Sequence, residues 1–153
     1  MPVLRENPYG DFNFLVSLGG AQGEGEPASI VGGFAAVTGL GLEIDYVEYR
    51  NGNEKVNSPR RLPGLTRFPD LVLRRGLVGS DDLFAWIRTV SEGTPDPRSV
   101  TLTLLDEARN AVATWRLRRA QPKKWIGPAL TATGGSEVAM EELVLVYEGI
   151  ELE

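Results

Sequence analysis

The sequence predicts a mainly β fold, a β-rich α+β domain built as an antiparallel β-sandwich or barrel with one packed α-helix. Two observations lead to this prediction. Apolar and polar residues alternate in several short runs, which is the pattern of half-buried strands. The 18 glycines and 10 prolines fall between these runs, as expected for strands joined by turns. Residues 1–153 are expected to form a single domain.

The first half of the chain contains four segments that we expect to be strands. Residues 12–18 place Phe12, Phe14, Val16 and Leu18 on one face. A short strand is expected within 30–38. Residues 42–49 alternate again, with Leu42, Ile44 and Tyr46 on one side. Residues 70–74 form the next predicted strand.

Two loops separate these strands. Residues 19–29 are rich in Gly, Pro and Glu. Residues 50–65 are predicted to form a long polar loop that Pro59 and Pro63 stiffen. Connections longer than about 12 residues in compact domains are usually functional or disordered. We therefore expect residues 50–65 to have a function.

One helix is predicted from Ser80 to about residue 92. Ser80 is a suitable N-cap, and the two aspartates that follow lie where the helix dipole favours carboxylates. Gly93 is the stop signal, with two prolines close behind it. The apolar stripe that should face the core consists of Leu83, Trp86, Ile87 and Val90.

The second half of the chain predicts an antiparallel hairpin. Residues 99–105 and 111–119 alternate, and the polar residues 106–110 connect them as a turn. Residues 122–128 contain two prolines and are expected to break the strand pattern. Residues 137–147 form the last predicted strand.

The composition excludes several kinds of site. The chain has no histidine and no cysteine, so a Ser-His-Asp triad, thiolate chemistry, disulfides and cysteine-based metal sites are impossible. The net charge of −5 argues against general affinity for nucleic acid. We expect a protein that is not an enzyme and that holds no cofactor and no metal.

The chain shows no signal for a membrane. Residues 1–8 lack the apolar core of a signal peptide, and no apolar run approaches the ~18 residues needed to span a bilayer. We expect a soluble protein that folds in the cytoplasm and does not insert into a membrane.

The candidate functional residues would make contacts between copies of the chain. Several predicted strands have few protective charges, and uncovered strand edges pair readily with other strands. The segment expected to dock onto a neighbouring subunit is Arg60, Arg61, Leu62, Pro63, Gly64 and Leu65, and the terminal segments are further candidates. Trp125 fits the core and an interface equally well. Arg116 and Arg118 share a strand face, which is either a solvated, edge-protecting stripe or a contact with an acidic neighbour.

Short motifs occur along nearly the whole chain in a fixed order. They are Asn7-Pro8-Tyr9-Gly10-Asp11-Phe12-Asn13-Phe14, Gly33-Phe34, Gly39-Leu40, Glu48-Tyr49-Arg50, Arg61-Leu62-Pro63-Gly64-Leu65-Thr66, Leu73-Arg74-Arg75-Gly76-Leu77, Trp115, Pro122-x-Lys124-Trp125-x-Gly127-Pro128, and Glu142-Leu143 to Glu148-Gly149. Each motif alone is weak. Together they resemble the T4-type phage tail tube family, which includes the inner tubes of extracellular contractile injection systems.

The resemblance implies a tail-tube or Hcp-like fold and a subunit that forms stacked hexameric rings around a hollow lumen. The implied partners are other copies of the chain, the sheath protein, the baseplate and spike hub, the tail terminator or cap, and the tape measure. The implied cargo is DNA or an effector protein. Arg116 and Arg118 would then belong to a charged face that points to the lumen or the sheath. The finished protein would be part of a phage tail or a contractile particle that can be released from the cell.

Two other functions remain as alternatives. One is a component of the baseplate hub that starts the tube. The other is a stand-alone β-sandwich module that binds a small ligand or a sugar as a monomer with a defined pocket.

Overall fold

The computed structural model describes residues 2–19, 30–79, 81–134 and 138–153. Strands dominate these residues, and one helix lies between the sixth and seventh strands. In chain order the elements are β1 (Phe14–Leu18), β2 (Ile30–Gly32), β3 (Ala36–Thr38), β4 (Glu43–Tyr49), β5 (Arg60–Arg67), β6 (Leu71–Gly76), α1 (Asp82–Ser91), β7 (Arg98–Leu105), β8 (Ala111–Ile126), β9 (Met140–Val146) and β10 (Gly149–Leu152).

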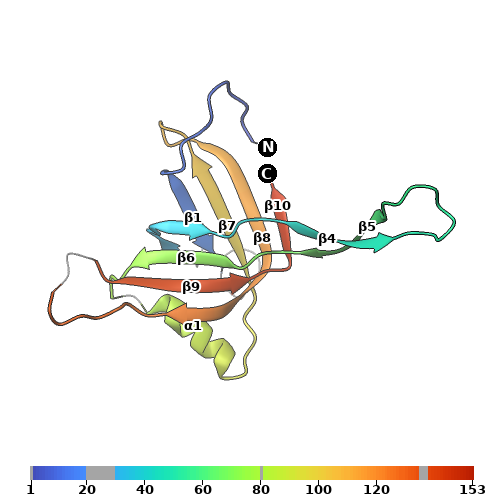
Figure 1. The fold of residues 1–153 in the computed structure, drawn as a ribbon. Coiled ribbons are helices and arrows are strands. Elements are labelled where there is room, and N and C mark those ends of the chain that lie inside the picture. The colour runs from blue at the N-terminus through green and yellow to red at the C-terminus, as the bar shows by residue number, and fades with distance from the viewer. Residues whose placement is uncertain (1, 20–29, 80, 135–137) are drawn as a thin grey trace.

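Eight strands form one antiparallel sheet that folds over on itself. Their order in space is β2-β1-β7-β8-β9-β6-β3, and β10 pairs with β8 beside this path. Figure 1 shows β1, β7 and β10 aligned along a common axis, with β1 antiparallel to the other two, while β6 and β9 cross them, so that the sheet makes two layers. The two remaining strands, β4 and β5, pair only with each other among the described residues.

The long strand β8 belongs to both layers. Its first part pairs with β7 and β10, and its last part pairs with β9. Between these parts Arg119 has a φ of 50°, and the register shifts between Pro122 and Lys124. A left-handed residue and a bulge both bend a strand, which allows one strand to pass from one layer to the other.

The hydrophobic core lies between the two layers. Alternate residues of each strand point into it, so the apolar residues at every second position are buried. The fully buried side chains are Val16, Leu18, Val100 and Leu117 from the first layer and Leu71, Leu73, Leu143 and Leu145 from the second.

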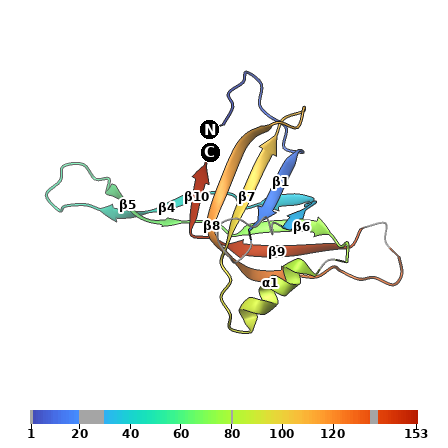
Figure 2. The ribbon, with the colours of Figure 1, turned by 180° about the vertical axis from the view of Figure 1, so that it is seen from behind.

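Helix α1 packs against β8 at one end of the sandwich (Figure 2). Its buried residues are Leu83 and Trp86. The Nε1 of Trp86 donates a hydrogen bond to the carbonyl oxygen of Asp96 at 2.8 Å, and the guanidinium of Arg98 lies 4.7 Å from the centre of the indole ring. Gly93 follows the helix with a φ of 97°, a conformation that favours glycine.

A charged network links this helix to the second layer. Arg75 of β6 is only 4% exposed, and its Nε donates a hydrogen bond to Glu141 of β9 at 2.5 Å. Its terminal nitrogens donate to Asp82 of α1. The Nε1 of Trp125 donates to the second carboxylate oxygen of Glu141 at 3.2 Å. One buried guanidinium therefore joins two strands and the helix.

The network keeps Arg75 charged. Burial lowers the pKa of Arg75, but its hydrogen bonds and charge contacts with Asp82 and Glu141 outweigh this effect and hold the pKa above its ordinary value. A buried charge of this kind is costly unless each partner is in place.

The fold class predicted from the sequence is confirmed, since the structure is mostly antiparallel sheet with one short helix. Within 30–38 it has two short strands, β2 and β3. The turn at 106–110 is also present, closed by hydrogen bonds between Asp106 and Asn110. Ser80 and the segment 20–29 lie outside the described residues, and α1 begins at Asp82 with Asp81 at its N-cap position.

The prediction of a loop over 50–65 is wrong in its second part, because Arg60–Arg67 is the strand β5. Pro59 and Pro63 favoured the loop interpretation. Proline is nevertheless tolerated in a two-stranded hairpin, because each strand has one edge that forms no backbone hydrogen bonds with another strand. β5 is exposed along its whole length, so burial could not impose on it the alternation that reveals a strand.

Two further expectations for strands are wrong, and one short strand was not predicted. Residues 122–128 do not end the strand, because β8 continues to Ile126 and Pro122 is accommodated beside the bulge. The expected last long strand is present as β9 (Met140–Val146), with residue 137 outside the described residues, and the four-residue β10 that follows it was not predicted. Phe12 precedes β1 and is exposed rather than in the core.

We expect Glu141→Ala to destabilise the unassembled chain by about 3 kcal/mol, because it takes a partner from the buried Arg75. Glu142→Ala is the matched control. Glu142 points to the opposite face of the same strand and pairs with Arg74 at 2.8 Å near the surface, so its loss should cost at most about 1 kcal/mol. Urea unfolding of both variants measures the difference. Equal losses would contradict the importance of the buried network.

Candidate functional site

The hairpin of β4 and β5 projects away from the rest of the molecule (Figure 1, Figure 2). Every residue of β5 is exposed, and only Asp45 of β4 is half-buried. A two-stranded hairpin is marginally stable in water unless it packs against something else. The hairpin therefore presents a ribbon that has almost no packing partner among the described residues.

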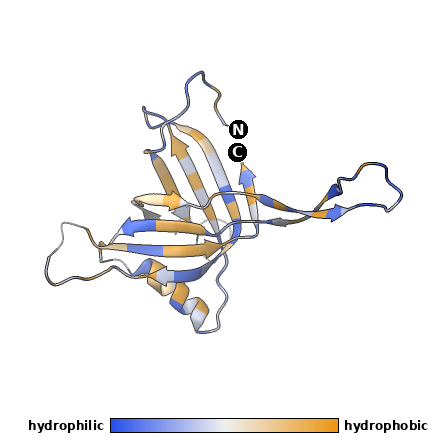
Figure 3. Cartoon of the chain, viewed as in Figure 1, coloured by the Kyte–Doolittle hydropathy of each residue, from blue (hydrophilic) through white to orange (hydrophobic). Residues whose placement is uncertain are grey.

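Both faces of this hairpin carry apolar side chains. Tyr46 lies opposite Pro63, and Val47 lies opposite Leu62. Residues directly opposite each other share a face of the ribbon, and successive residues of a strand point to opposite faces. The two pairs therefore lie on opposite sides of the ribbon. Figure 3 shows hydrophobic and hydrophilic segments alternating along both strands. Leu65, beside the irregularity in the pairing, is 76% exposed.

Polar contacts order the tip of the hairpin. Arg50 donates hydrogen bonds to the carbonyl oxygens of Glu54 and Val56, both at 3.0 Å. Arg60 pairs with the carboxylate of Glu54 at 3.0 Å. The amide of Glu54 donates to the carbonyl oxygen of Asn51 at 3.1 Å. The loop at the tip is thus held in one shape by charged side chains from both strands.

The structure brings the six predicted docking residues, Arg60 to Leu65, together on β5. They form an exposed strand rather than a corner in a loop. Arg61 makes a long ion pair with Glu48 at 4.0 Å across the hairpin. Contact of these residues with a second copy stays a prediction.

The sheet also has free strand edges. Among the described residues, β10 pairs only with β8 and β2 pairs only with β1. Thr114 and Glu153 exchange two backbone hydrogen bonds. In an antiparallel pair every second residue of a strand bonds to the partner strand, and the residues between them point their N–H and C=O groups to the other side. The backbone groups of Ile150 and Leu152 therefore point away from β8. These groups are available to another strand.

Arg116 and Arg118 lie exposed on the outward face of β8, and β10 supplies carboxylates beside them. Arg119 is exposed at the bend that follows. The ion pairs are Arg116 with Glu153 at 3.3 Å, Arg118 with Glu151 at 3.7 Å and Arg119 with Glu148 at 3.0 Å. We call these six side chains the arginine–glutamate patch.

Trp125 packs against other residues of its own chain. It lies on β8, half-buried against the core, and its ring meets that of Phe84 on α1 edge-on with centroids 5.1 Å apart. Its indole nitrogen donates to Glu141. These contacts explain its position without another copy, and its role at an interface stays a prediction.

An apolar cleft of about 360 Å³ opens between the layers, lined by residues that include Phe14, Val37, Leu104 and Trp115. Asp11 is the ionisable side chain in its lining. No group of three or more His, Cys, Asp or Glu side chains that could hold a metal occurs in the described part of the chain. The cleft thus offers shape but no set of converging polar groups of the kind that fixes a small ligand.

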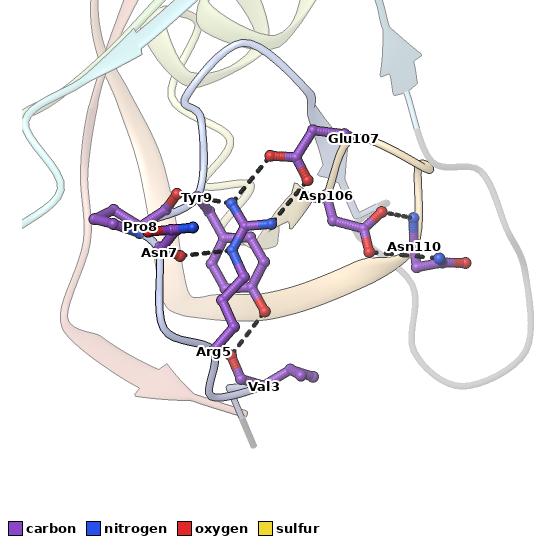
Figure 4. Close-up of polar contacts among 8 residues, drawn as sticks. All are labelled: Val3, Arg5, Asn7, Pro8, Tyr9, Asp106, Glu107 and Asn110. Atoms are coloured by element: carbon purple, nitrogen blue, oxygen red, sulfur yellow. Dashed lines mark hydrogen bonds and ion pairs between the residues drawn. The ribbon is translucent and has the colours of Figure 1, made fainter.

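The residues before β1 lie against the turn between β7 and β8 (Figure 4). Arg5 donates two hydrogen bonds to the carboxylate of Glu107 at 2.8 and 3.0 Å. It also donates to the carbonyl oxygens of Asn7 and Pro8, and its guanidinium carbon lies 3.8 Å from the centre of the Tyr9 ring. We call this arrangement the N-terminal clasp.

Backbone contacts extend the N-terminal clasp. The amide of Val3 donates to the carbonyl oxygen of Val112 at 2.9 Å, and the hydroxyl of Tyr9 donates to the carbonyl oxygen of Val3 at 2.9 Å. The hydrogen bonds from Arg5 hold the pKa of Glu107 at about 2, well below its ordinary value of 4.5. The same pairing raises the pKa of Arg5.

Sequence reasoning missed both the N-terminal clasp and the buried Arg75 network. A signal for the network was present: Arg74-Arg75 in one strand and Glu141-Glu142 in another are complementary pairs, and the structure places them in register. No comparable pattern marks Arg5 and Glu107, which are 102 residues apart.

We expect the carboxylate of Glu107 to titrate near pH 2 and to shift toward 4.5 in Arg5→Ala. Because the folded-state pKa is lowered, the contribution of this pair to stability is present above about pH 4.5 and is lost as the pH falls toward 2. Carboxyl ¹³C chemical shifts measured against pH check this in the unassembled chain. A carboxylate that titrates at the same pH in both proteins would show that the N-terminal clasp does not form in solution.

No helix in the described residues is long and apolar enough to cross a membrane. No curated protein sequence matches the chain.

Several solved structures share this fold. A chain of the PVC sheath–tube complex, an extracellular contractile injection system in its extended state, is 27% identical, with 97% of this chain and 93% of that chain covered and a TM-score of 0.80. A chain of the anti-feeding prophage baseplate is 25% identical, with 97% of each chain covered and a TM-score of 0.83. Hcp1 from Flavobacterium johnsoniae, at 14% identity, 90% and 94% coverage and a TM-score of 0.52, shares the fold alone.

The model of one protein family, described as T4-like virus tail tube protein gp19, matches residues 10–151. This range includes the projecting hairpin, the arginine–glutamate patch except for its last residue, and the sheet with the free edges of β2 and β10. The chain therefore belongs to the T4-like virus tail tube protein family and is a structural subunit of the inner tube of a contractile system.

Proposed function

We propose that copies of this chain join through their free strand edges into rings of six, and that the rings stack into a hollow tube. The projecting hairpin carries this proposal. It exposes apolar side chains on both faces and has almost no packing partner among the described residues of its own chain. Surface of this kind is typical of sites where another protein binds.

The free edges of β10 and β2 account for growth within a ring. The outer backbone groups of β10 meet no partner strand among the described residues, and β2 ends the same layer on its other side. An edge strand of one copy placed beside the opposite edge of the next continues the sheet. A closed ring of such layers leaves neither the β10 edge nor the β2 edge exposed, which removes the hazard that these free edges create.

The hairpin then accounts for contact between rings. Residues Arg60 to Leu65 lie on its return strand, where Leu62 and Leu65 offer apolar area and the two arginines offer charge. A projecting ribbon reaches beyond the subunit that carries it, so it suits docking onto the adjacent ring. Trp125 is a weaker candidate, because α1 and Glu141 already contact it.

The proposal extends to the partners. The similar structures are named as sheath–tube, terminator, cap and baseplate assemblies, which supports a sheath around this tube, a baseplate hub below it and a cap above it. We propose a structural role without catalysis, assembly in the cytoplasm, and DNA or an effector protein as the cargo in the lumen.

A second candidate is a subunit that starts the tube at the baseplate. The 25% identity to a chain of the anti-feeding prophage baseplate structure favours it as much as it favours a tube subunit. The length of the assembled product separates the two. A subunit that extends the tube polymerises into long stacks, whereas one that starts it stops at a single ring or a few rings.

We expect Val47→Asp/Leu62→Asp to abolish stacking, because two carboxylates on one face of the hairpin oppose the burial of that face. The stability of the unassembled chain should change by less than about 0.5 kcal/mol, since both side chains are exposed. Negative-stain electron microscopy at high protein concentration measures stacking, and urea unfolding measures stability.

Val78→Asp is the matched control. Val78 is 79% exposed in the connection between β6 and α1, away from the hairpin. It should leave the tubes intact. A wild-type chain that stays monomeric at all concentrations, even beside baseplate components, would contradict the proposed function. Tubes formed by the hairpin variant would contradict only the role of the hairpin.

A further inference from the structure

The hairpin of β4 and β5 joins the rest of the molecule through two short connections. Residues 39–42 lead from β3 into β4, and residues 68–70 lead from β5 into β6. Among the described residues, no backbone hydrogen bond ties either hairpin strand to another strand of the molecule. The direction in which the hairpin points is therefore set by the contacts of these two connections, which we call its first and second legs.

One buried side chain, Tyr147, contacts both legs. It lies between β9 and β10 and is 6% exposed. Its hydroxyl donates to the carbonyl oxygens of Gly39 and Gly41, at 3.3 and 3.2 Å, and accepts a hydrogen bond from the amide of Gly41 at 3.4 Å. Its ring packs against the ring of Phe68 in the second leg, with centroids 5.3 Å apart. Tyr147 thus holds the first leg by hydrogen bonds and the second leg by ring packing.

The two legs also lie against each other. Gly39 has a φ of 92°, and a Cβ at this position would overlap the carbonyl oxygen of Asp70, so only glycine fits there. A Cβ on Gly41 would lie 3.4 Å from the ring of Pro69. The Nζ of Lys123 on β8 donates to the carboxylate of Asp70 at 2.7 Å. The base of the hairpin is thus closely packed, although its strands are exposed.

We propose that Tyr147 is a positioning residue, whose hydroxyl fixes the direction of the hairpin so that the hairpins of one ring can dock together onto the next. This proposal rests on the proposed function. A small change in each copy is enough to prevent stacking, because six hairpins must point correctly at the same time. If each hairpin keeps the docking direction half of the time, all six keep it together about 1/64 of the time, and the apparent affinity between rings falls by that factor.

Removal of the hydroxyl should leave the core and the ring edge in place. In Tyr147→Phe the aromatic ring can stay packed against Phe68, so the core keeps almost its whole volume. β10 is held by its own ladder with β8, from Gly149 to Leu152. Formation of single rings and stacking of rings should therefore respond differently to this substitution.

The direction of the hairpin is measured in the unassembled chain by double electron–electron resonance. Because the chain has no cysteine, Asn53→Cys near the tip and Ala108→Cys in the turn between β7 and β8 take spin labels at these two positions alone. We expect a narrow distribution of distances in this labelled chain and a broader one when Tyr147→Phe is added. The matched control is Thr89→Val, which removes a hydroxyl that donates to the carbonyl oxygen of Ala85 within α1 at 2.9 Å. The control should keep the narrow distribution.

Electron microscopy of the unlabelled proteins measures rings and tubes separately. Tyr147→Phe should form single rings at the same protein concentration as the wild type, and it should need at least about tenfold more protein to form tubes. Thr89→Val should form both as the wild type does. Tubes of Tyr147→Phe at the wild-type concentration would overturn the proposal. An equal loss of rings and tubes would also overturn it, because the hydroxyl would then serve the fold as a whole, and so would a distance distribution that stays narrow.

The wild-type chain separates this proposal from the proposed function. If wild-type chains form no rings, the proposed function fails, and the distances in the unassembled chain still decide whether Tyr147 directs the hairpin. If wild-type chains form tubes and Tyr147→Phe behaves like Thr89→Val, the positioning role of Tyr147 is overturned while the proposed function stands.

Discussion

The bend in β8 is the constraint on which the rest of the structure depends. This strand is hydrogen-bonded to β7 and β10 before the bend and to β9 after it, and it also contacts α1. The left-handed Arg119 and the bulge near Pro122 turn it from one layer to the other. The bend therefore sets the crossing of the layers, the end of the core that α1 covers, and the face on which Arg116 and Arg118 lie.

Interactions inside the chain and those left for other copies are clearly separated in this molecule. Leucines and valines fill the space between the layers, and the buried Arg75 ties β6, β9 and α1 together through Glu141 and Asp82. In contrast, the hairpin of β4 and β5 and the outer edge of β10 contribute little to the core. Such a division suits a subunit that is stable before assembly and gains contacts when a ring closes.

The sequence predicted the elements whose buried residues recur at a regular spacing. β1, β6, β7 and α1 each have an apolar face against the core, so alternation or helical spacing revealed them. Alternation also revealed β4, although that strand is exposed, but two other parts of the chain were misjudged where burial imposes no regular spacing. β5 is exposed on both faces and contains Pro63, and Pro122 lies in the part of β8 that changes layers. Pairings between distant segments, such as Arg5 with Glu107, could not be found from spacing, because only the fold brings them together. Exposed strand edges had already indicated contacts between copies, and the family resemblance added the hexameric rings and their stacking into a tube.

Hydrogen–deuterium exchange before and after assembly tests the central claim most directly, namely that other copies complete the hairpin and the free edges. The account predicts that the amides of β4, β5 and the outer edge of β10 exchange rapidly in the single chain and become strongly protected in the tube. The amides of β7 and β9, already paired on both sides, should change little. Rapid exchange of the hairpin and of β10 in fully formed tubes would contradict the account.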